Sequence, residues 1–176
     1  MAKRAQTLAE RPMTTALLLR DVTRDDLPIF FEQQLDPEAN HMAAFTAKDP
    51  TNRDTFMAHW NRILADSTVI IKTVVFDGHV IGSVLSYEES GRPEVSYWLG
   101  KEYWDKGLAT RALSDFLAHV NSTRPIYARV AKDNIRSLRV LTKCGFVITG
   151  ESKGFANARG KDIEELVLEL RGDKTQ

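Results

Sequence analysis

The stretch EVSYWLGKEYWDKGLATRAL, residues 94–113, contains a strand pattern, a loop and the start of a helix. A strand-like run leads into the polar loop 101–106, and the apolar residues after Gly107 recur every three or four positions, as in an amphipathic helix. The first turn of a helix carries unpaired N–H groups and the positive end of the helix dipole. Because Gly107 and Ala109 have little or no side chain, a bulky anion could approach this backbone. The stretch therefore predicts a phosphate site, with an ordinary strand-to-helix turn as the alternative.

The part of the chain before this stretch predicts an antiparallel hairpin. Residues 69–76 and 79–87 are strand-like runs, and the Asp77-Gly78 pair between them is among the strongest signals for a two-residue turn. The strand at the start of the quoted stretch follows after a second turn at residues 90–93. These three runs predict a meander of neighbouring strands.

Helices and further strands are expected on both sides of this meander. We expect strands over residues 16–22 and 125–131, and helices over 25–36, 52–66 and within 132–146. Asp25 or Asp26 is the expected cap of the first helix, and Asp133 or Asn134 that of the last. Residues 36–50 show little pattern, which predicts a long irregular loop. This order of elements favours an α/β fold with a mixed sheet and helices on both faces.

Composition narrows the class of protein. The 176 residues include 24 Lys and Arg and 24 Asp and Glu, so no overall charge favours nucleic acid. Cys144 is the one cysteine, and the four histidines lack ligand spacing, so we expect neither a disulfide framework nor a metal site. No run approaches the ~18 apolar residues of a membrane span, and the start lacks the apolar centre of a secretory signal. We expect a cytoplasmic enzyme or binding module with no nucleic-acid or membrane partner.

Two motifs give the chain a resemblance to a known family. WDKGLA at residues 104–109 is similar to an acyl-CoA loop, and it is followed by a second series, Asn134, Ser137, Lys143, Gly145 and Phe146. In this order and at this separation, the motifs resemble the GNAT superfamily of N-acetyltransferases. The quoted stretch resembles the branch that includes ribosomal-protein N-terminal alanine acetyltransferases. That branch also contains antibiotic and polyamine acetyltransferases, so the acceptor does not follow from the resemblance.

The resemblance extends over roughly residues 17–170 and implies a fold. It is an α/β fold with a mostly antiparallel central sheet of six to seven strands, splayed at the acyl-CoA site, with helices on both faces. We expect one GNAT-like acyltransferase domain over residues 15–171, between a flexible extension over 1–14 and a flexible tail over 172–176.

The resemblance also implies the residues of the site. Glu94 stands where the family often places its general base, and Ser137 is the candidate that hydrogen-bonds or protonates the leaving thiolate. The alternative for Glu94 is a solvated charge at the strand end, and the alternative for Ser137 is a capping role in its helix. Asn134 binds the pantetheine arm or caps the helix. The residues expected to bind the cofactor are Trp98, Leu99, Gly100, Trp104, Asp105, Lys106, Gly107, Leu108, Ala109, Thr110, Asn134, Arg136 and Ser137.

Two positions depart from the family pattern. The acyl-CoA loop usually begins with Gln or Arg and then Gly, whereas this chain has Trp104 and Asp105. A carboxylate beside a pyrophosphate should weaken binding unless it points away, and aspartate tolerates a left-handed backbone better than most residues. Many family members have a tyrosine general acid at the position of Leu141, so a tyrosine mechanism does not carry over directly. The aromatic residues Tyr97 and Tyr103 are expected either in the core or in the wall of the acceptor pocket.

The expected function is N-acetyl transfer. The acetyl group would move from acetyl-CoA to a primary amine, a protein N-terminus or a small amine, by direct attack in a ternary complex and without a metal. The alternative is a non-catalytic acyl-CoA-binding or regulatory module of the same fold. The sequence leaves the acceptor open and allows a homodimer.

Overall fold

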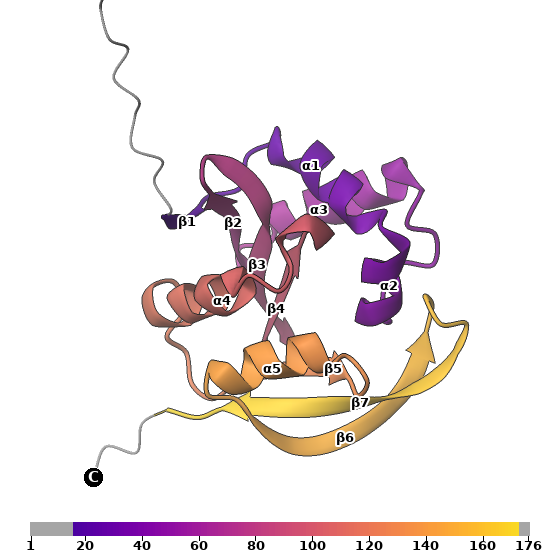
Figure 1. The fold of residues 1–176 in the computed structure, drawn as a ribbon, viewed down its shortest axis with the longest axis vertical. Coiled ribbons are helices and arrows are strands. Elements are labelled where there is room, and N and C mark those ends of the chain that lie inside the picture. Colours follow the sequence, from indigo (N-terminus) through magenta and orange to yellow (C-terminus); the bar gives the residue numbers. More distant parts are fainter. Residues whose placement is uncertain (1–15, 173–176) are drawn as a thin grey trace, which may run out of the picture.

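A computed structural model describes residues 16–172, which form a seven-stranded sheet in the order β1-β2-β3-β4-β5-β7-β6 (Figure 1). The strands are β1 (Leu17–Arg20), β2 (Ile70–Phe76), β3 (His79–Glu89), β4 (Arg92–Leu99), β5 (Ile126–Ala131), β6 (Val147–Ala156) and β7 (Lys161–Leu170). The helices are α1 (Asp26–Gln34), α2 (Pro37–Ala43), α3 (Arg53–Ala65), α4 (Leu108–His119) and α5 (Ile135–Lys143), with a 3₁₀ turn, η1, at Lys101–Tyr103. The expected α/β architecture with six to seven strands is confirmed.

The predicted hairpin joins β2 and β3. Asp77 and Gly78 both have a positive φ, 50° and 74°, as the tight hairpin turn requires, and Phe76 pairs with His79 across it. The pairing of β2 with β3 shifts register between Val74, which pairs with Gly82, and Val75, which pairs with Val80. A Cβ at Gly82 would lie 2.0 Å from the carbonyl oxygen of Trp98, so only glycine fits where β3 approaches β4 this closely.

The sheet is antiparallel except where β4 meets β5. These two strands are parallel, and within residues 16–172 their register contains a single pair, Glu94 with Tyr127. Antiparallel β3–β4 pairing continues to Leu99, and antiparallel β5–β7 pairing continues to Ala131. The two central strands therefore separate beyond Glu94, which confirms the expected splay.

Helices cover both faces of the sheet, as predicted. On one face, Leu27 and Phe30 of α1 pack with Trp60 of α3 against Ile71 and Val80. Val74 points the other way because side chains of a strand alternate between faces. Val84 does so as well, because the register shift between Val80 and Gly82 changes the alternation along β3. There they pack with the apolar stripe of α4, in which Leu113 and Phe116 are fully buried. Figure 1 shows α1 and α3 together, and α4 beside α5.

Three sequence expectations need correction. Asp25 occupies the cap position of α1, but among the described residues its side chain makes no capping hydrogen bond. Asp26 is buried and instead accepts hydrogen bonds from Arg20, Thr23 and Thr73. The segment 36–50 is not irregular throughout, because α2 lies within it. The first strand is also shorter than expected, ending at Arg20.

The start of helix α2 follows standard capping chemistry. The side chain of Asp36 accepts a hydrogen bond of 2.8 Å from the backbone N–H of Ala39, and Pro37 occupies the first helical position. The predicted end of α5 is confirmed: Gly145 has a φ of 92°, and Phe146 packs back into the core with 2% of its surface exposed.

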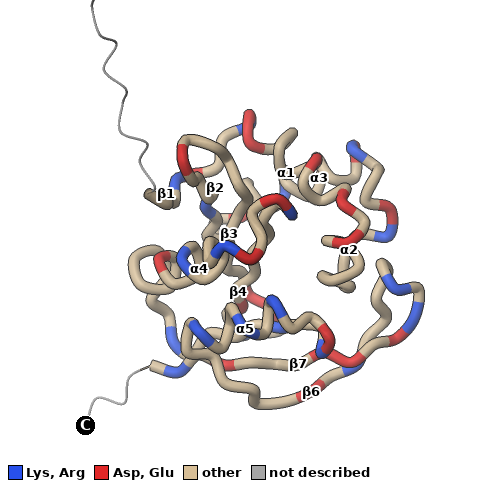
Figure 2. The backbone as a smooth tube through the Cα atoms, in the orientation of Figure 1, with Lys and Arg blue, Asp and Glu red and all other residues tan. Residues whose placement is uncertain are grey.

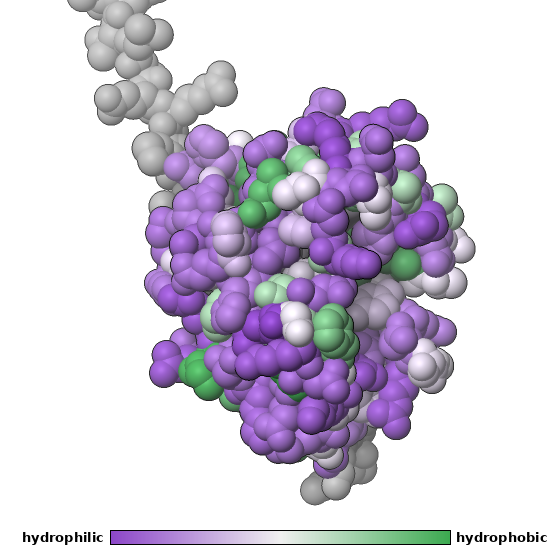
Figure 3. All heavy atoms as spheres, turned by 90° about the vertical axis from the view of Figure 1, so that its right-hand side faces the viewer, coloured by the Kyte–Doolittle hydropathy of each residue, from purple (hydrophilic) through white to green (hydrophobic). Residues whose placement is uncertain are grey.

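The charged residues of both signs are interspersed over the fold (Figure 2). The face shown in Figure 3 is mainly hydrophilic, with its hydrophobic residues in small separate patches. Among the described residues, no helix is both long and apolar enough to span a membrane. The expected extension over residues 1–14 and residues 173–176 of the expected tail lie outside the described residues.

Candidate active site

A pocket of about 600 Å³ follows the gap between β4 and β5. Its walls include Tyr97 and Leu99 from β4 and Val130 and Ala131 from β5. The start of α5 and the loop before α4 line it as well. The separation of the two strands thus produces a cavity in the middle of the sheet, and both predicted motifs reach it.

The backbone of β4 offers hydrogen-bonding groups to this gap. Gly100 N–H donates to the carbonyl of Ile81 on β3, at 3.0 Å. Backbone groups of alternate residues in a strand face the same neighbour, so those of Trp98 also face β3, whereas those of Tyr97 and Leu99 face the gap. The Leu99 carbonyl accepts a 3.0 Å hydrogen bond from Trp104 Nε1. The amide of Gly100 is therefore not available to a ligand in the gap, contrary to the sequence expectation, and the amides of Tyr97 and Leu99 are the donors there.

Trp98 is also among the residues that line the pocket. Its indole Nε1 is buried and has no hydrogen-bond partner among the described residues. Trp98 therefore belongs to the pocket wall, although its backbone groups face β3.

The loop before α4 has the shape that the sequence predicts for an anion site. Asp105 and Gly107 have φ values of 58° and 73°, in the left-handed region, and α4 begins at Leu108. Among the described residues, no side chain caps this helix. The first N–H that bonds back to the loop is that of Arg111, to the carbonyl of Gly107 at 3.1 Å. The preceding amides of the first turn, residues 108–110, are therefore the expected unpaired donors, and all three residues line the pocket.

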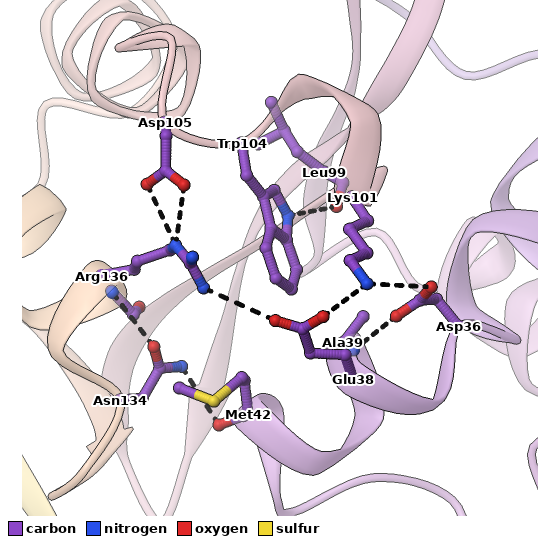
Figure 4. A network of polar contacts seen from close by, with 11 residues as sticks. Asp36, Glu38, Ala39, Met42, Leu99, Lys101, Trp104, Asp105, Asn134 and Arg136 are labelled. Carbon is purple, nitrogen blue, oxygen red and sulfur yellow. Dashed lines mark hydrogen bonds and ion pairs between the residues drawn. The ribbon is translucent and has the colours of Figure 1, made fainter.

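Arg136 at the start of α5 holds the carboxylate of Asp105 (Figure 4). Its Nε lies 3.0 and 3.1 Å from the two carboxylate oxygens, and its guanidinium lies 5.1 Å from the ring centroid of Trp104. On the other side, Arg136 Nη1 is 4.0 Å from Glu38 of α2, which also pairs with Lys101. A row of alternating charges therefore connects α5, the loop and α2 beside the pocket.

Asn134 caps α5 and ties it to α2. Its Oδ1 accepts a hydrogen bond from the backbone N–H of Ser137, at 3.2 Å, and its Nδ2 donates to the carbonyl of Met42, at 3.1 Å. The capping alternative for Asn134 is confirmed. Because Asn134 supplies the cap, the hydroxyl of Ser137 is used elsewhere.

The hydroxyl of Ser137 meets that of Tyr97, with 2.6 Å between the two oxygens. Burial raises the pKa of Tyr97 to about 12, although the hydrogen bond with Ser137 acts in the opposite direction. The tyrosine hydroxyl missing at position 141 is thus matched by one that comes from β4. The sequence contained one signal for it: Tyr97 alternates with Val95 and Leu99, which places it on the face covered by α4 and α5.

Glu94 is buried, with 3% of its surface exposed, so the alternative of a solvated strand-end charge is wrong. Its Oε1 accepts a 3.0 Å hydrogen bond from Arg129 Nε, and Tyr87 Oη donates to Oε2 at 3.4 Å. Arg129 Nη1 also bonds Glu165, at 3.2 Å. Burial and the charge of Glu94 raise the pKa of Tyr87 to about 12, so this phenol keeps its proton. Sequence reasoning missed Tyr87, Arg129 and Glu165.

Most of the predicted cofactor residues come together at the pocket. Those that line it are Trp98, Leu99, Trp104, Asp105, Gly107, Leu108, Ala109, Thr110, Asn134, Arg136 and Ser137. Gly100 and Lys106 are not part of the lining. Glu94 lies behind Tyr87 and Arg129, which do line the pocket, so it is reached through them rather than directly.

Comparisons with known proteins agree with this arrangement. A family model described as "Acetyltransferase (GNAT) domain" matches residues 16–147. The chain is 25% identical over 168 residues to an uncharacterized N-acetyltransferase, p20, from Bacillus licheniformis, covering 89% of this chain and 93% of that protein. It is 24% identical over 119 residues to YdaF from Bacillus subtilis (strain 168), described as a putative ribosomal N-acetyltransferase, covering 62% of this chain and 65% of that protein.

The fold is also similar to that of a solved structure, Mycobacterium smegmatis RimJ in complex with CoA-disulfide. The TM-score is 0.76 at 19% sequence identity, over 90% of this chain and 83% of that one. At this identity the likeness concerns the fold. The family match covers most of the chain and includes the loop and helix that build the pocket. The chain therefore belongs to the GNAT acetyltransferase domain family.

Proposed function

We propose that this protein transfers the acetyl group of acetyl-CoA to a primary amine by direct attack in a ternary complex. The observation that carries the proposal is the gap between β4 and β5, which opens directly after the pair Glu94 and Tyr127. The unpaired amides at the start of α4 lie along the pocket that follows this gap, and Ser137 lines the same pocket. Family membership supports acetyl transfer as the reaction.

The residues present fit coenzyme A. The amides of residues 108–110 suit a pyrophosphate, because a helix N-terminus attracts anions and Gly107 leaves the approach open. The amides of Tyr97 and Leu99 suit the amide carbonyls of a pantetheine arm. Acetyl-CoA supplies an acetyl thioester, whose carbonyl carbon is the target of the amine.

Glu94 is the proposed general base. The amine must lose a proton as its nitrogen bonds to the acetyl carbon, and a carboxylate can take that proton through water. Arg129 and Tyr87 fix both carboxylate oxygens, so the group is held in one orientation. Because these two residues stand between Glu94 and the pocket, the proton path passes beside them.

The acceptor half of the pocket combines apolar and charged groups. Met42 and Phe45 line it from the region of α2, and Arg129 and Glu165 line it from β5 and β7. A protein N-terminus and a small amine both remain candidates, and the similarity to the putative ribosomal acetyltransferase YdaF favours the first. The competing proposal is a non-catalytic acyl-CoA-binding module, which the absence of a tyrosine at position 141 favours.

An acceptor screen tests the function. Purified protein with acetyl-CoA is offered peptides with different N-terminal residues and, in parallel, small amines, and free CoA thiol is measured. Amine-dependent thiol release with a matching acetylated product is the expected result. Binding of CoA without turnover on any amine would support the binding module, and absence of binding would contradict both proposals.

A further inference from the structure

The contact between Tyr97 and Ser137 joins two elements that the sequence keeps 40 residues apart. Tyr97 comes from β4, on the side of the gap where the strand faces α4 and α5, and Ser137 comes from the first turn of α5. Both residues line the pocket, and their oxygens are 2.6 Å apart. Two hydroxyls therefore meet at the wall of the cavity that is expected to hold the thioester.

The chemistry of the two groups decides which one donates. A phenol is a stronger acid than an aliphatic alcohol, and its oxygen is the weaker acceptor because its lone pair is delocalised into the ring. Burial also raises the pKa of Tyr97, so the phenol keeps its proton at neutral pH. The favoured arrangement is thus Tyr97 O–H donating to Ser137 Oγ. Within residues 16–172 the Ser137 hydroxyl has no second partner, so its own proton is available to another acceptor.

We propose that Tyr97 is a positioning residue that orients and polarises the Ser137 hydroxyl toward the sulfur of coenzyme A. This inference rests on the proposed function. As the amine nitrogen bonds to the acetyl carbon, the carbon–sulfur bond breaks and its electron pair goes to sulfur. Ser137 donates a hydrogen bond to the resulting thiolate, and Tyr97 donates to Ser137. Both hydroxyls keep their protons. The amine proton that Glu94 takes up through water is the one that finally neutralises the thiolate, so Glu94 returns to its ionised form.

The pair Tyr97 and Ser137 also explains how the site can work without a tyrosine at position 141, which is Leu141. This residue lies one helical turn after Ser137 and is buried in the core with 2% of its surface exposed, so the helix offers no hydroxyl at that position. Ser137, on the same helix, supplies the hydrogen bond instead, and Tyr97 of β4 polarises it. A hydrogen-bond chain is strengthened when each member polarises the next, so the pair should be a better donor than serine alone.

The direct test is the titration of the thiol of bound coenzyme A, which requires neither an acceptor nor turnover. The ultraviolet absorbance of the thiolate is followed against pH, with CoA at saturation, for the wild type, Tyr97→Phe, Ser137→Ala and the double variant. Hydrogen bonds to a charged group stabilise it by roughly 1.5–3 kcal/mol, so the bound thiol should have a pKa about one to two below that of free CoA. Tyr97→Phe should raise the pKa of the bound thiol part of the way back to that of free CoA, and Ser137→Ala should raise it most of the way. The double variant should match Ser137→Ala, because Tyr97 acts through Ser137.

Tyr127→Phe is the matched control. Tyr127 is partly buried on β5, and its ring contacts Arg92 outside the pocket, so loss of its hydroxyl should leave the titration unchanged. Once an acceptor is known, Tyr97→Phe should lower kcat about tenfold with little change in the KM for acetyl-CoA. Equal thiol titrations in wild type and Tyr97→Phe would overturn the inference while leaving acetyl transfer in place. Additive effects of the two single substitutions would overturn it as well. Absence of CoA binding to the wild type would instead overturn the proposed function and this inference with it.

Discussion

Arg136 Nε lies 3.0 Å from one carboxylate oxygen of Asp105 and 3.1 Å from the other, so the one acidic residue of the WDKGLA loop is paired with the guanidinium at the start of α5. Asp105 adopts a left-handed backbone, which turns its side chain toward Arg136 and leaves it two-thirds exposed. The negative charge that would disfavour a pyrophosphate is therefore partly balanced. The same pair engages Arg136, a residue expected to bind the cofactor.

Asp105→Asn should strengthen the binding of CoA about three- to tenfold, because a repulsive charge is removed and Arg136 is released. Asparagine also accepts the left-handed backbone, so the loop should keep its shape. Calorimetric affinities at low and high salt check this, and the gain should shrink at high salt because exposed charges are screened. Asp115→Asn, which removes the same charge from the middle of α4, is the control. Weaker binding by Asp105→Asn would show that the carboxylate positions Arg136 for the cofactor.

Gly107→Val should abolish the thermal stabilisation by CoA. At a hundredfold excess over Kd, a ligand stabilises the folded state by about 2.7 kcal/mol, which corresponds to a rise in Tm of roughly 5–11 °C for a domain of this size. Valine at a φ of 73° would strain the backbone and place its side chain where the phosphates approach.

Gly160→Val provides the control for that strain. Gly160 lies in the turn between β6 and β7, away from the pocket lining, with a φ of 63°, and in the described structure a Cβ at either glycine meets no atom within 4 Å. The Gly160 variant should lose stability but keep the full shift with CoA. A preserved shift in Gly107→Val would mean that the phosphates bind elsewhere.

Glu94→Gln should lower kcat by ~10² to 10⁴ near neutral pH, the usual cost of losing a general base, with little change in the affinity for acetyl-CoA. The loss should shrink at high pH, where the amine loses its proton unaided. Glu165→Gln, which changes the other carboxylate on Arg129, should have the smaller effect on kcat. Full activity of Glu94→Gln at neutral pH would remove Glu94 from the mechanism and leave it as a structural partner of Arg129.

Asp26→Asn should destabilise the protein by about 2 kcal/mol at neutral pH and remove part of its acid sensitivity. Burial alone would raise the pKa of Asp26, but hydrogen bonds from Arg20, Thr23 and Thr73 outweigh it and lower the pKa to about 2. Because the folded pKa lies below the ordinary value, this stability is present above about pH 4 and is lost as the pH falls toward 2. Urea unfolding at several pH values measures it. The neighbouring exposed Asp25 is the control, and Asp25→Asn should change the free energy of unfolding by less than about 0.5 kcal/mol.

The elements with strong local signals could be predicted from the sequence. The Asp77-Gly78 turn requires a positive φ at both residues, and the apolar stripe of α4 has one clear period, so neither depends on distant contacts. The helix α2 was missed because seven residues are too few for a periodic pattern, although Asp36 followed by Pro37 marked its start.

The site was predictable only in part, for a physical reason. The loop residues around Gly107 are neighbours in sequence, and their backbone geometry follows from local rules. The partners of Glu94 and Ser137 lie 35 and 40 residues away, on strands whose neighbours the sequence does not specify. Burial of Glu94 therefore could not be distinguished from exposure at a strand end. The alternation along β4 did place Tyr97 on the same face as Val95 and Leu99, but it did not indicate the contact with Ser137.

Because β4 and β5 share a single register pair, the backbone pairing of this sheet is weakest at its centre. Sheets commonly fray at their outer strands, whereas here the weakest backbone pairing runs through the centre, between a half built from β1–β4 and a half built from β5–β7. A ligand with amides along its length can act there as an extra strand and supply missing rungs of the ladder to both halves. Bound acetyl-CoA would then stabilise the contact between the two halves of the sheet, and release of CoA would weaken that contact again.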